Sequence, residues 1–305
     1  MHDIAWIKEI FEDQMHMEAS AIHRFENVPN NSVFRIETGA GPYIFKVYAK
    51  RDWPEDGKIP FVYRKLTEHD IPHAQLFVFD REDARFPNGY SIEECLPGTT
   101  ADRLALSESE TLRLFEQLAA LVSRIHRIGM TNYGYTGGGT PAVWTTFSAY
   151  MYDVLTDNAA GLIANGFMEA ADLAGLNQAI YGKLKQYDLF PSVLCHGDLS
   201  AKNMLVNADE ITLIDWDDAQ SLCWITDVAR LTFWMRIHYD GRLAAACKKT
   251  FLDSYETAHD KNAYCELEDV LHVWHGLDSL TFFTEGEICE KLEVLVRASR
   301  DRCGI

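Results

Sequence analysis

Apolar and polar residues alternate along residues 32–48 in the manner of a β-hairpin. The first predicted strand covers residues 32–36 and the second covers residues 43–48, and the turn is expected at 38–42, where two glycines and a proline lie. A period of two then divides the second strand into two faces. One face holds Ile44, Lys46 and Tyr48, and the other holds Tyr43, Phe45 and Val47.

Lys46 stands in the middle of this apolar strand. Burying an ammonium group costs several kcal/mol unless an opposite charge pairs with it. Two explanations are therefore open. Lys46 lies on an edge strand, where a lysine discourages aggregation, or its partner is an anionic ligand.

The pattern changes to a helical period after the first third of the chain. Ser107 and Glu110 form a predicted capping box at the start of a helix. Apolar residues recur along that helix at Leu114, Phe115, Leu118, Leu121, Val122 and Ile125. Further helices are expected over residues 144–164, 167–187 and 242–303. The chain thus combines a strand-rich N-terminal part with a mainly helical remainder, as in an α+β fold.

Two polar motifs flank a second predicted hairpin. They are HGDLSAKN at residues 196–203 and LIDW at residues 213–216. The strands between them are expected at residues 204–207 and 211–214. A hairpin of that length returns Asn203 and Asp215 to the same end, where both can reach one cation. Mg²⁺ takes few protein oxygens and keeps its other positions for phosphates and water.

Phosphoryl transfer from a magnesium nucleotide needs this set of groups. One carboxylate, here Asp198, would orient or deprotonate the acceptor hydroxyl, while Asn203 and Asp215 would hold the metal on the phosphates. Lys46 would then bind the nucleotide phosphates. The alternative is that Asp198 and Asn203 only cap turns, as Asp and Asn often do.

The order of these residues reads as a kinase catalytic loop with Gly197 in place of the usual arginine. It resembles the aminoglycoside phosphotransferase and choline kinase-like family of small-molecule kinases. The resemblance implies a two-lobed, protein kinase-like α+β fold. A small N-terminal nucleotide-binding lobe with an antiparallel sheet would cover residues 1–95, and a larger, mainly helical catalytic and acceptor-binding lobe would cover 96–305, with a hinge at about 91–98.

The nucleotide-binding residues that the resemblance implies are Asn31, Ser32, Ile44, Lys46, Glu94, Leu96 and Lys202. The polar pair before the first hairpin would meet the phosphates, and the two hinge residues would offer backbone groups to the purine. The lysine of the catalytic loop either points toward the transferred phosphate or faces solvent. The glycine triplet at 137–139 is expected to be a loop and not a phosphate-binding turn.

One departure from the family concerns the acid that usually pairs with the lysine. The family carries a Glu on the helix after the lysine strand, but segment 59–69 has no acid at that place. Glu55 and Asp56 come too early, and Glu68 comes too late. Either the helix is shifted, or Lys46 is held differently, or the site is compromised.

The resemblance also implies supporting and acceptor-binding residues. His196 and Asp227 would support the catalytic loop, and His126 is expected to be packed and hydrogen-bonded and not a ligand. In the family the C-terminal helices help to build the acceptor pocket, which is often acidic when the acceptor carries amines, so Asp278 and Glu285 are candidate substrate residues. A solvated helix face explains most of the late acids. These acids are Glu266, Glu268, Asp269, Asp278, Glu285, Glu287 and Glu290.

The amino-acid composition limits the classes of molecule that the chain is expected to bind. Lys and Arg number 28 against 46 Asp and Glu, which gives a net charge of −18. That charge argues against nucleic acid or an anionic membrane surface and favours a cationic or neutral substrate. The 7 cysteines show no CxxC pair and no metal spacing, which suits a reducing cytoplasm. No signal peptide and no membrane-spanning apolar run is visible.

The sequence therefore predicts a cytoplasmic, Mg²⁺-dependent O-phosphotransferase that uses ATP or GTP and acts on a hydroxyl of a small, amine-bearing molecule. An aminoglycoside or amino sugar is favoured, with antibiotic resistance as the associated role. Choline-like amino alcohols and sugar metabolites remain open as acceptors. The rival is a non-catalytic kinase-like nucleotide-binding module, motivated by the absent helical Glu and opposed by the intact Asp198, Asn203 and Asp215.

Overall fold

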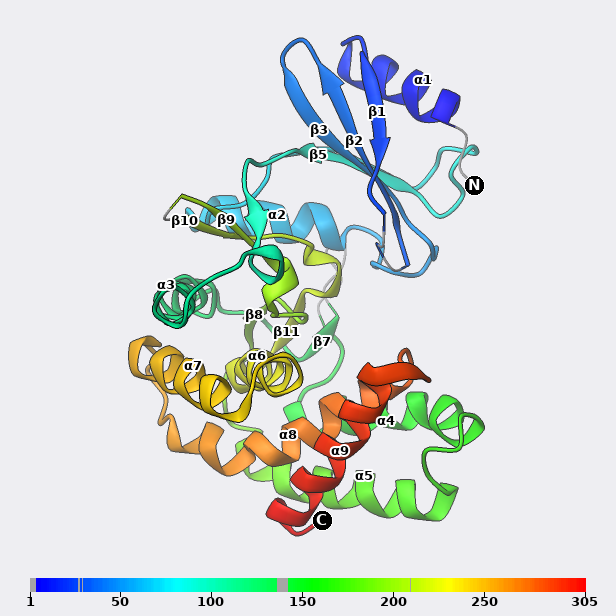
Figure 1. Cartoon of the computed structure of the whole chain (residues 1–305). Coiled ribbons are helices and arrows are strands. Elements are labelled where there is room, and N and C mark those ends of the chain that lie inside the picture. Colours follow the sequence, from blue (N-terminus) through cyan, green and yellow to red (C-terminus); the bar gives the residue numbers. More distant parts are fainter. Residues whose placement is uncertain (1–3, 27, 29, 136–141, 209) are drawn as a thin grey trace. The chain divides into compact units, whose positions relative to one another are not determined.

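The structure is a computed structural model that describes residues 4–26, 28, 30–135, 142–208 and 210–305. These residues form two compact units (Figure 1). The first contains the described residues of Met1–Thr99 and of Leu205–Asp218. The second contains Thr100–Tyr135, the described residues of Pro141–Met204, and Ala219–Ile305. The glycine triplet predicted to be a loop lies outside the described residues.

The first unit is built on a five-stranded antiparallel sheet in the order β1-β2-β3-β5-β4. The strands are β1 (Ala21–Arg24), β2 (Ser32–Thr38), β3 (Gly41–Val47), β4 (Leu76–Asp80) and β5 (Tyr90–Glu94). Because β3 lies between β2 and β5, Lys46 is on a central strand. The explanation of Lys46 as an edge lysine is therefore wrong.

The hairpin predicted over residues 32–48 is confirmed, with a tighter turn than expected. β2 and β3 pair along their whole length, so that the turn shrinks to Gly39 and Ala40. Thr38 closes it, because its Oγ1 accepts a hydrogen bond from the backbone N of Ala40 (3.1 Å) and donates one to the backbone O of Gly41 (2.7 Å). Gly41 has a φ of 129°, a conformation that favours glycine.

The two faces of this sheet differ as the alternation predicted. One face packs against α1 (Ile4–Met15). Its core consists of Ile7, Ile10, Phe11, Ala19, Phe34, Ile36, Phe45, Val47, Phe86, Tyr90 and Ile92. The other face carries Lys46 and Tyr48, both buried. Helix α2 (Lys58–Glu68) reaches this second face through Tyr63, whose hydroxyl donates to Glu93 on β5.

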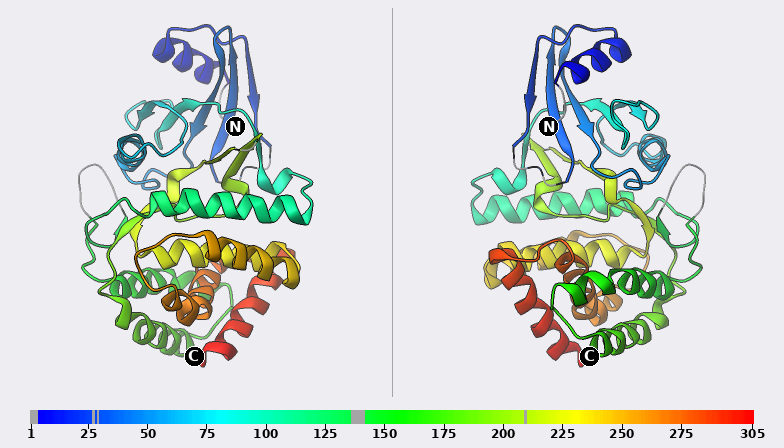
Figure 2. Two further views of the ribbon diagram at one scale, coloured as in Figure 1. Left: turned by 90° about the vertical axis from the view of Figure 1, so that its left-hand side faces the viewer. Right: turned by 90° about the vertical axis from the view of Figure 1, so that its right-hand side faces the viewer.

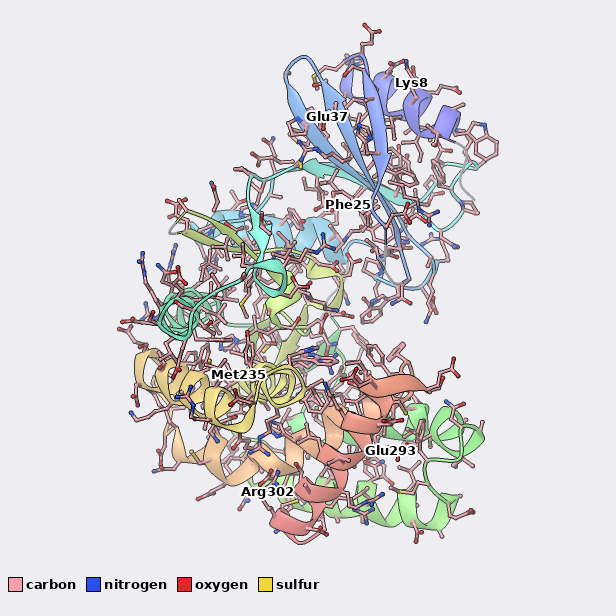
Figure 3. The ribbon with its side chains drawn as sticks, viewed as in Figure 1. Lys8, Phe25, Glu37, Met235, Glu293 and Arg302 are labelled. Atoms are coloured by element: carbon pink, nitrogen blue, oxygen red, sulfur yellow. The ribbon has the colours of Figure 1, made fainter. Side chains whose placement is uncertain are left out.

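The second unit is mainly helical (Figure 2). Its helices are α3 (Glu108–Ile125), α4 (Phe147–Ala164), α5 (Ala170–Leu184), α6 (Trp224–His238), α7 (Gly241–Ser254), α8 (Asn262–Leu280) and α9 (Gly286–Cys303), with short 3-10 turns η1 (Ala101–Arg103) and η2 (Lys185–Tyr187). α7 packs against α3 and α6, and α8 packs against α4, α6 and α9. Arg302 ties α9 to α8 through a 2.6 Å ion pair with Asp269 (Figure 3).

The predicted start of α3 is confirmed. Ser107 Oγ accepts from the backbone N of Glu110 (3.3 Å), and the backbone N of Ser107 donates to the Glu110 carboxylate (2.7 Å), which completes the capping box. The six apolar residues predicted to line this helix are all buried. α4 begins three residues later than residue 144, because Thr146 is its N-cap. The helix predicted over 167–187 is α5 followed by η2.

Two small three-stranded sheets complete the fold, in the orders β10-β9-β6 and β7-β11-β8. Their strands are β6 (Thr99–Thr100), β7 (Gly134–Tyr135), β8 (Val193–Cys195), β9 (Met204–Asn207), β10 (Glu210–Leu213) and β11 (Gln220–Leu222). The second predicted hairpin is thus confirmed as β9 and β10. No helix in the described part of the chain is long and apolar enough to cross a membrane.

Helices α8 and α9 approach each other closely at Gly276. A Cβ atom added there would lie 2.2 Å from Val296 Cγ2, which is far inside van der Waals contact. Val296 is buried and β-branched, so its methyl group has few rotamers into which it can withdraw. Glycine at position 276 is therefore a packing requirement of the helix pair.

We expect Gly276→Ala to lower the free energy of unfolding by about 1–3 kcal/mol, because overpacking outweighs the better helix propensity of alanine. The matched control is Gly175→Ala on α5, where nothing lies within 4 Å of an added Cβ. That control should gain about 0.5–1 kcal/mol. Urea titration of both variants measures the difference, and equal stability of the two would contradict the close approach.

Candidate active site

The segment from His196 to Asn203 leaves β8 and enters β9 through the short turn η3 (Ala201–Asn203), and Asp227 in the first turn of α6 holds its backbone. Asp227 accepts hydrogen bonds from the backbone N of His196 (2.6 Å) and of Gly197 (2.9 Å). Burial alone would raise the pKa of Asp227, but the hydrogen bond with His126 and the nearby charges lower it overall. The carboxylate is therefore an ionised clamp on this loop.

The two histidines beside the clamp are buried and hydrogen-bonded. His126 Nε2 lies 3.2 Å from Asp227 and its Nδ1 lies 2.7 Å from the Tyr255 hydroxyl. His196 Nδ1 lies 3.4 Å from the backbone N of Asp198. His126, Cys195 and Asp227 have ligand-type atoms within 4.8 Å of one another. However, the hydrogen bonds engage His126 and Asp227, and burial raises the pKa of the Cys195 thiol, so the cluster is built for support of the loop.

Asp198 is buried and surrounded by donors. Lys202 Nζ lies 2.8 Å from its Oδ2, Arg230 Nη2 lies 3.4 Å from its Oδ1, and Asn203 Nδ2 donates to its Oδ2 at 3.0 Å. Burial alone would raise the pKa of Asp198, but the Arg230 and Lys202 charges hold it well below its usual range. Asp198 is therefore an ionised, oriented acceptor of hydrogen bonds and a weak base.

Arg230 links Asp198 to one of the predicted acceptor residues. Its Nη1 lies 3.8 Å from Asp278 Oδ2, and Asn158 Nδ2 donates to Asp278 Oδ1 at 3.0 Å. Burial raises the pKa of Asp278. Asp278 thus lies one side chain away from Asp198, with both of its carboxylate oxygens already facing donors of the chain itself.

The other predicted acceptor residue lies on an exposed loop. Glu285 is the exposed N-cap of α9 and follows Phe282 and Phe283, which are 63% and 40% exposed. The Phe283 ring packs edge-on against Trp234 of α6 with centroids 6.1 Å apart. The Arg230 guanidinium lies 5.4 Å from the Trp234 centroid. A continuous series of contacts therefore runs from Asp198 to this loop.

The first unit carries Lys46 and the acids around it. Lys46 Nζ donates to Asp215 Oδ1 at 2.9 Å and lies 3.2 Å and 3.3 Å from the two carboxylate oxygens of Asp217. Burial alone would lower the pKa of Lys46, but Asp215 and Asp217 hold it well above the ordinary value. Lys46 is thus a charged, buried ammonium. Of the three explanations for the absent helical Glu, the structure supports the second, that Lys46 is held differently.

Asp217 is fixed on several sides. Asn31 Nδ2 donates to its Oδ2 at 2.9 Å, and Lys58 Nζ donates to its backbone O at 3.1 Å. Lys58 is fully buried, pairs with Glu55 at 2.5 Å and stacks over the Trp53 ring at 3.8 Å. Burial raises the pKa of Asp217 to about 6, although Lys46 opposes this.

Asp215 differs from Asp217 in exposure and backbone. Its side chain is 48% exposed, and its φ of 64° is in the left-handed region. A non-glycine residue in that region is uncommon, and Asp is among the residues that tolerate it. Asp215 therefore presents a carboxylate that a ligand can reach.

The other predicted nucleotide residues lie on the same unit. Ile44 is half-buried on the Lys46 face of β3, opposite Glu93, and Ser32 Oγ accepts from Arg24 at 3.4 Å. In the predicted hinge, the exposed Glu94 donates its backbone N to Gln75 O at 2.8 Å, and Leu96 is half-buried. The amide of Asn31 is engaged with Asp217, so its side chain supports the lysine cluster.

Sequence reasoning missed several charged or polar residues around Lys46 and around Asp198. These are Lys58, Tyr63, Glu93, Asp217 and Arg230. A signal existed for two of them. Arg230 follows Asp227 by three residues on α6, and Asp217 follows Asp215 by two residues. For the other three, the contacts that connect them to the Lys46 cluster join residues far apart in sequence and leave no local pattern.

The sequence pattern of the phosphotransferase enzyme family matches residues 22–261. No curated protein matches the chain. Among solved structures, a thermostable mutant of an aminoglycoside phosphotransferase, in ternary complex with AMP-PNP and hygromycin B, is 18% identical, with 98% of this chain and 96% of that chain covered and a TM-score of 0.68.

Two further solved structures are similar over most of their length. A Plasmodium vivax ethanolamine kinase is 15% identical, covers 97% of this chain and 87% of its own, and gives a TM-score of 0.67. A protein named as a fructosamine-3-kinase of Thermobifida fusca is 17% identical, with coverages of 97% and 98% and a TM-score of 0.65. These neighbours confirm the predicted α+β, protein kinase-like fold.

The resemblance that the sequence suggested is thereby confirmed, and its catalytic motifs lie within the matched residues. The chain belongs to the phosphotransferase enzyme family and is a phosphotransferase that acts on a hydroxyl group of a small molecule.

Proposed function

We propose that this phosphotransferase transfers the γ-phosphoryl group of ATP to a hydroxyl of a small, amine-bearing molecule, with an amino sugar or aminoglycoside favoured. The observation that carries the proposal is the loop from His196 to Asn203. It holds a buried, ionised Asp198 between two cations in a chain whose family transfers phosphoryl groups. ATP is favoured over GTP because a similar structure holds AMP-PNP.

Lys46 is the proposed phosphate ligand of the donor half. In the structure its ammonium group pairs with Asp215 and Asp217. Nucleotide phosphates would take the place of Asp215 as its partner, while Asp217 keeps the ammonium group oriented. Hinge groups at Glu94 and Leu96, together with Ile44 and Ser32, remain the proposed contacts of the rest of the nucleotide.

Asn203 and Asp215 are the proposed ligands of Mg²⁺, which would neutralise charge on the phosphates during transfer. The donor set fits a hard cation, since it consists of an amide and a carboxylate oxygen. The fit is also electrostatic, because Asp215, Asp217 and the buried Glu93 place three acids around one lysine. That excess of negative charge favours a cation near Asp215.

Asp198 is the proposed orienting group for the acceptor. The acceptor oxygen forms a bond to the γ-phosphorus while the bond from that phosphorus to the β,γ-bridging oxygen breaks, and ADP leaves. The hydroxyl proton is donated in a hydrogen bond to Asp198 and leaves with the phosphate product or solvent. Because Lys202 and Arg230 make Asp198 a weak base, we infer orientation and not early deprotonation as its role.

The acceptor class is inferred from the loop between α8 and α9. Exposed aromatic rings offer flat apolar surface to the carbon faces of a sugar, and acids beside them attract amines. Phe282, Phe283 and Glu285 combine both properties on one loop, which contacts the Arg230 side chain through Trp234. The net charge of −18 also favours a positively charged acceptor.

Two alternatives to this proposal are other acceptor classes and a non-catalytic module, and the activity test covers both. An ethanolamine kinase and a protein named as a fructosamine-3-kinase are among the similar structures, so amino alcohols and sugar amines belong in the acceptor panel. The non-catalytic module was motivated by the absence of a helical Glu. That motive weakens, because Asp215 and Asp217 both pair with Lys46.

We expect Asp198→Asn to lower kcat by about 10²–10⁴ and to leave Mg-ATP affinity unchanged, because the orienting charge is lost and the donor site is not touched. Asp215→Ala should abolish turnover. ADP release is measured over aminoglycosides, amino sugars, amino alcohols and neutral sugars, with the exposed Asp253→Asn on α7 as a control of full activity. Full activity in either active-site variant would refute the assignment.

We propose that Asp227 and His196 support the catalytic loop and take no part in chemistry. Asp227→Ala leaves two buried backbone N–H groups unpaired and should cost about 3–5 kcal/mol of unfolding free energy. Asp253→Ala, which removes only an exposed pair with Lys249, should cost less than about 0.5 kcal/mol. Denaturant unfolding compares the two, and a similar small loss in both would argue against a supporting role.

We expect Glu285→Gln to raise the KM for amine-bearing acceptors about two- to fivefold at low salt and to leave the KM for ATP unchanged, because one exposed charge is removed. The effect should fade as salt is added. Glu293→Gln, another exposed acid on α9 (Figure 3), is the matched control. An equal effect on neutral and cationic acceptors would show that the charge of Glu285 plays no part in their selection.

A further inference from the structure

Glu93 is a buried acid that the proposed reaction does not use. β3 and β5 pair so that Lys46 lies opposite Ser91 and Ile44 lies opposite Glu93. All four side chains therefore share one face of the sheet, and Glu93 is the diagonal neighbour of Lys46, a separation at which long side chains interact. Glu93 is 9% exposed.

The hydrogen bonds of Glu93 engage both of its carboxylate oxygens. Tyr63 donates its hydroxyl to Oε2 at 2.6 Å, and Ser91 donates its hydroxyl to Oε1 at 2.9 Å. Tyr48 in turn donates to Ser91 at 3.2 Å. Each carboxylate oxygen of Glu93 is therefore held in place by a hydroxyl group.

Hydroxyl groups orient Glu93 but do not neutralise its charge. A buried carboxylate is costly unless a positive charge compensates it. Within the described part of the chain, the hydrogen bonds to Glu93 come from neutral hydroxyls. The negative charge of Glu93 attracts the Lys46 ammonium group and raises the pKa of Lys46. Lys46 is therefore the charge partner of Glu93 as well as of Asp215 and Asp217.

Helix α2 is connected to Lys46 in this chain too, but through a tyrosine of the helix and an acid of β5. The resembled family places a Glu on the helix after the lysine strand. Here α2 presents the buried Tyr63 in its middle, and Tyr63 holds an acid that comes from β5. The helix thus still fixes the position of a carboxylate near Lys46.

We propose that Glu93, held by Tyr63 and Ser91, is a positioning residue that orients Lys46 toward the nucleotide phosphates in place of the absent helical glutamate. This inference rests on the proposed function. If Asp215 were to bind a metal and release Lys46, Glu93 would remain on the sheet face. Its charge would attract the ammonium group and restrict it to that face.

A double-mutant cycle on Mg-ATP affinity tests this role. The full-length chain carries Asp198→Asn to stop turnover, and calorimetry measures the dissociation constant for Glu93→Gln, Lys46→Met and the double variant. We expect Glu93→Gln to weaken binding about tenfold, which is within the range of coupling energies between neighbouring residues, because the Lys46 ammonium group loses a charge that orients it. In the Lys46→Met background the same change should alter affinity less than about twofold, because its effect acts through the lysine.

Tyr63→Phe provides a milder second variant, since it removes one hydroxyl and keeps the ring. Tyr63→Phe should weaken Mg-ATP binding about threefold when Lys46 is present. In the Lys46→Met background it should leave the affinity unchanged. Glu68→Gln, an exposed acid at the end of α2, is the matched control and should bind Mg-ATP like the parent.

The outcomes separate the inference from the proposed function. Additive losses in the double variants, or unchanged affinity in both Glu93→Gln and Tyr63→Phe, would overturn the role of Glu93. If Glu93→Gln proves unstable in a melting experiment, the Tyr63→Phe arm decides. Absence of Mg-ATP binding in the Asp198→Asn parent would instead count against the proposed function.

Discussion

A buried lysine in the central strand of the sheet is the constraint on which the first unit depends. Lys46 is 8% exposed, so water can do little to solvate its charge and the chain must bring acids to it. Two of those acids come from the segment after β10, which explains why Leu205–Asp218 belongs to the same compact unit as residues near the N-terminus. The left-handed backbone at Asp215 and the polar contacts of Asp217 are consequences of that requirement.

The second unit has the opposite arrangement, in which cations surround a buried acid. Asp198 is a buried acid, and two cations and an amide surround it, so its pKa falls where that of Asp217 rises. The two environments suit different tasks. An acid held by cations stays ionised and orients a hydroxyl without binding its proton tightly, whereas a surplus of acids around one ammonium group favours a further cation. The same residue type thus serves two functions because its neighbours differ.

Local pattern predicted much of the fold. The hairpin, the two faces of β3 and the capping box of α3 follow from periodicity and short-range hydrogen bonding, and the structure has all three. The predicted helix from residue 144 begins later, because Thr146 caps it and periodicity alone does not fix an end. The motif at 196–203 could be assigned a chemistry because its spacing is local.

The partners of those motifs could not be predicted in this way. The family pattern places the acid for Lys46 on the next helix, while Asp217 lies 171 residues further along the chain. The sequence places Glu93 only in the predicted hinge, because no local pattern ties it to Tyr63. Long-range pairs of this kind depend on which strands become neighbours, and one sequence does not contain that information in any local spacing.

The late acids show how burial changes the meaning of net charge. A solvated helix face was expected to explain most of them, but several are structural. Glu268 is buried between Lys248 and Tyr264, Asp269 pairs with Arg302, and Asp278 faces Arg230. An acid that already faces a cation of its own chain offers little attraction to a cationic acceptor, because the local potential is close to neutral. The exposed Glu285 beside Phe282 and Phe283 keeps its charge available, so the loop between α8 and α9 is a better candidate for amine selection than the more numerous acids on α8.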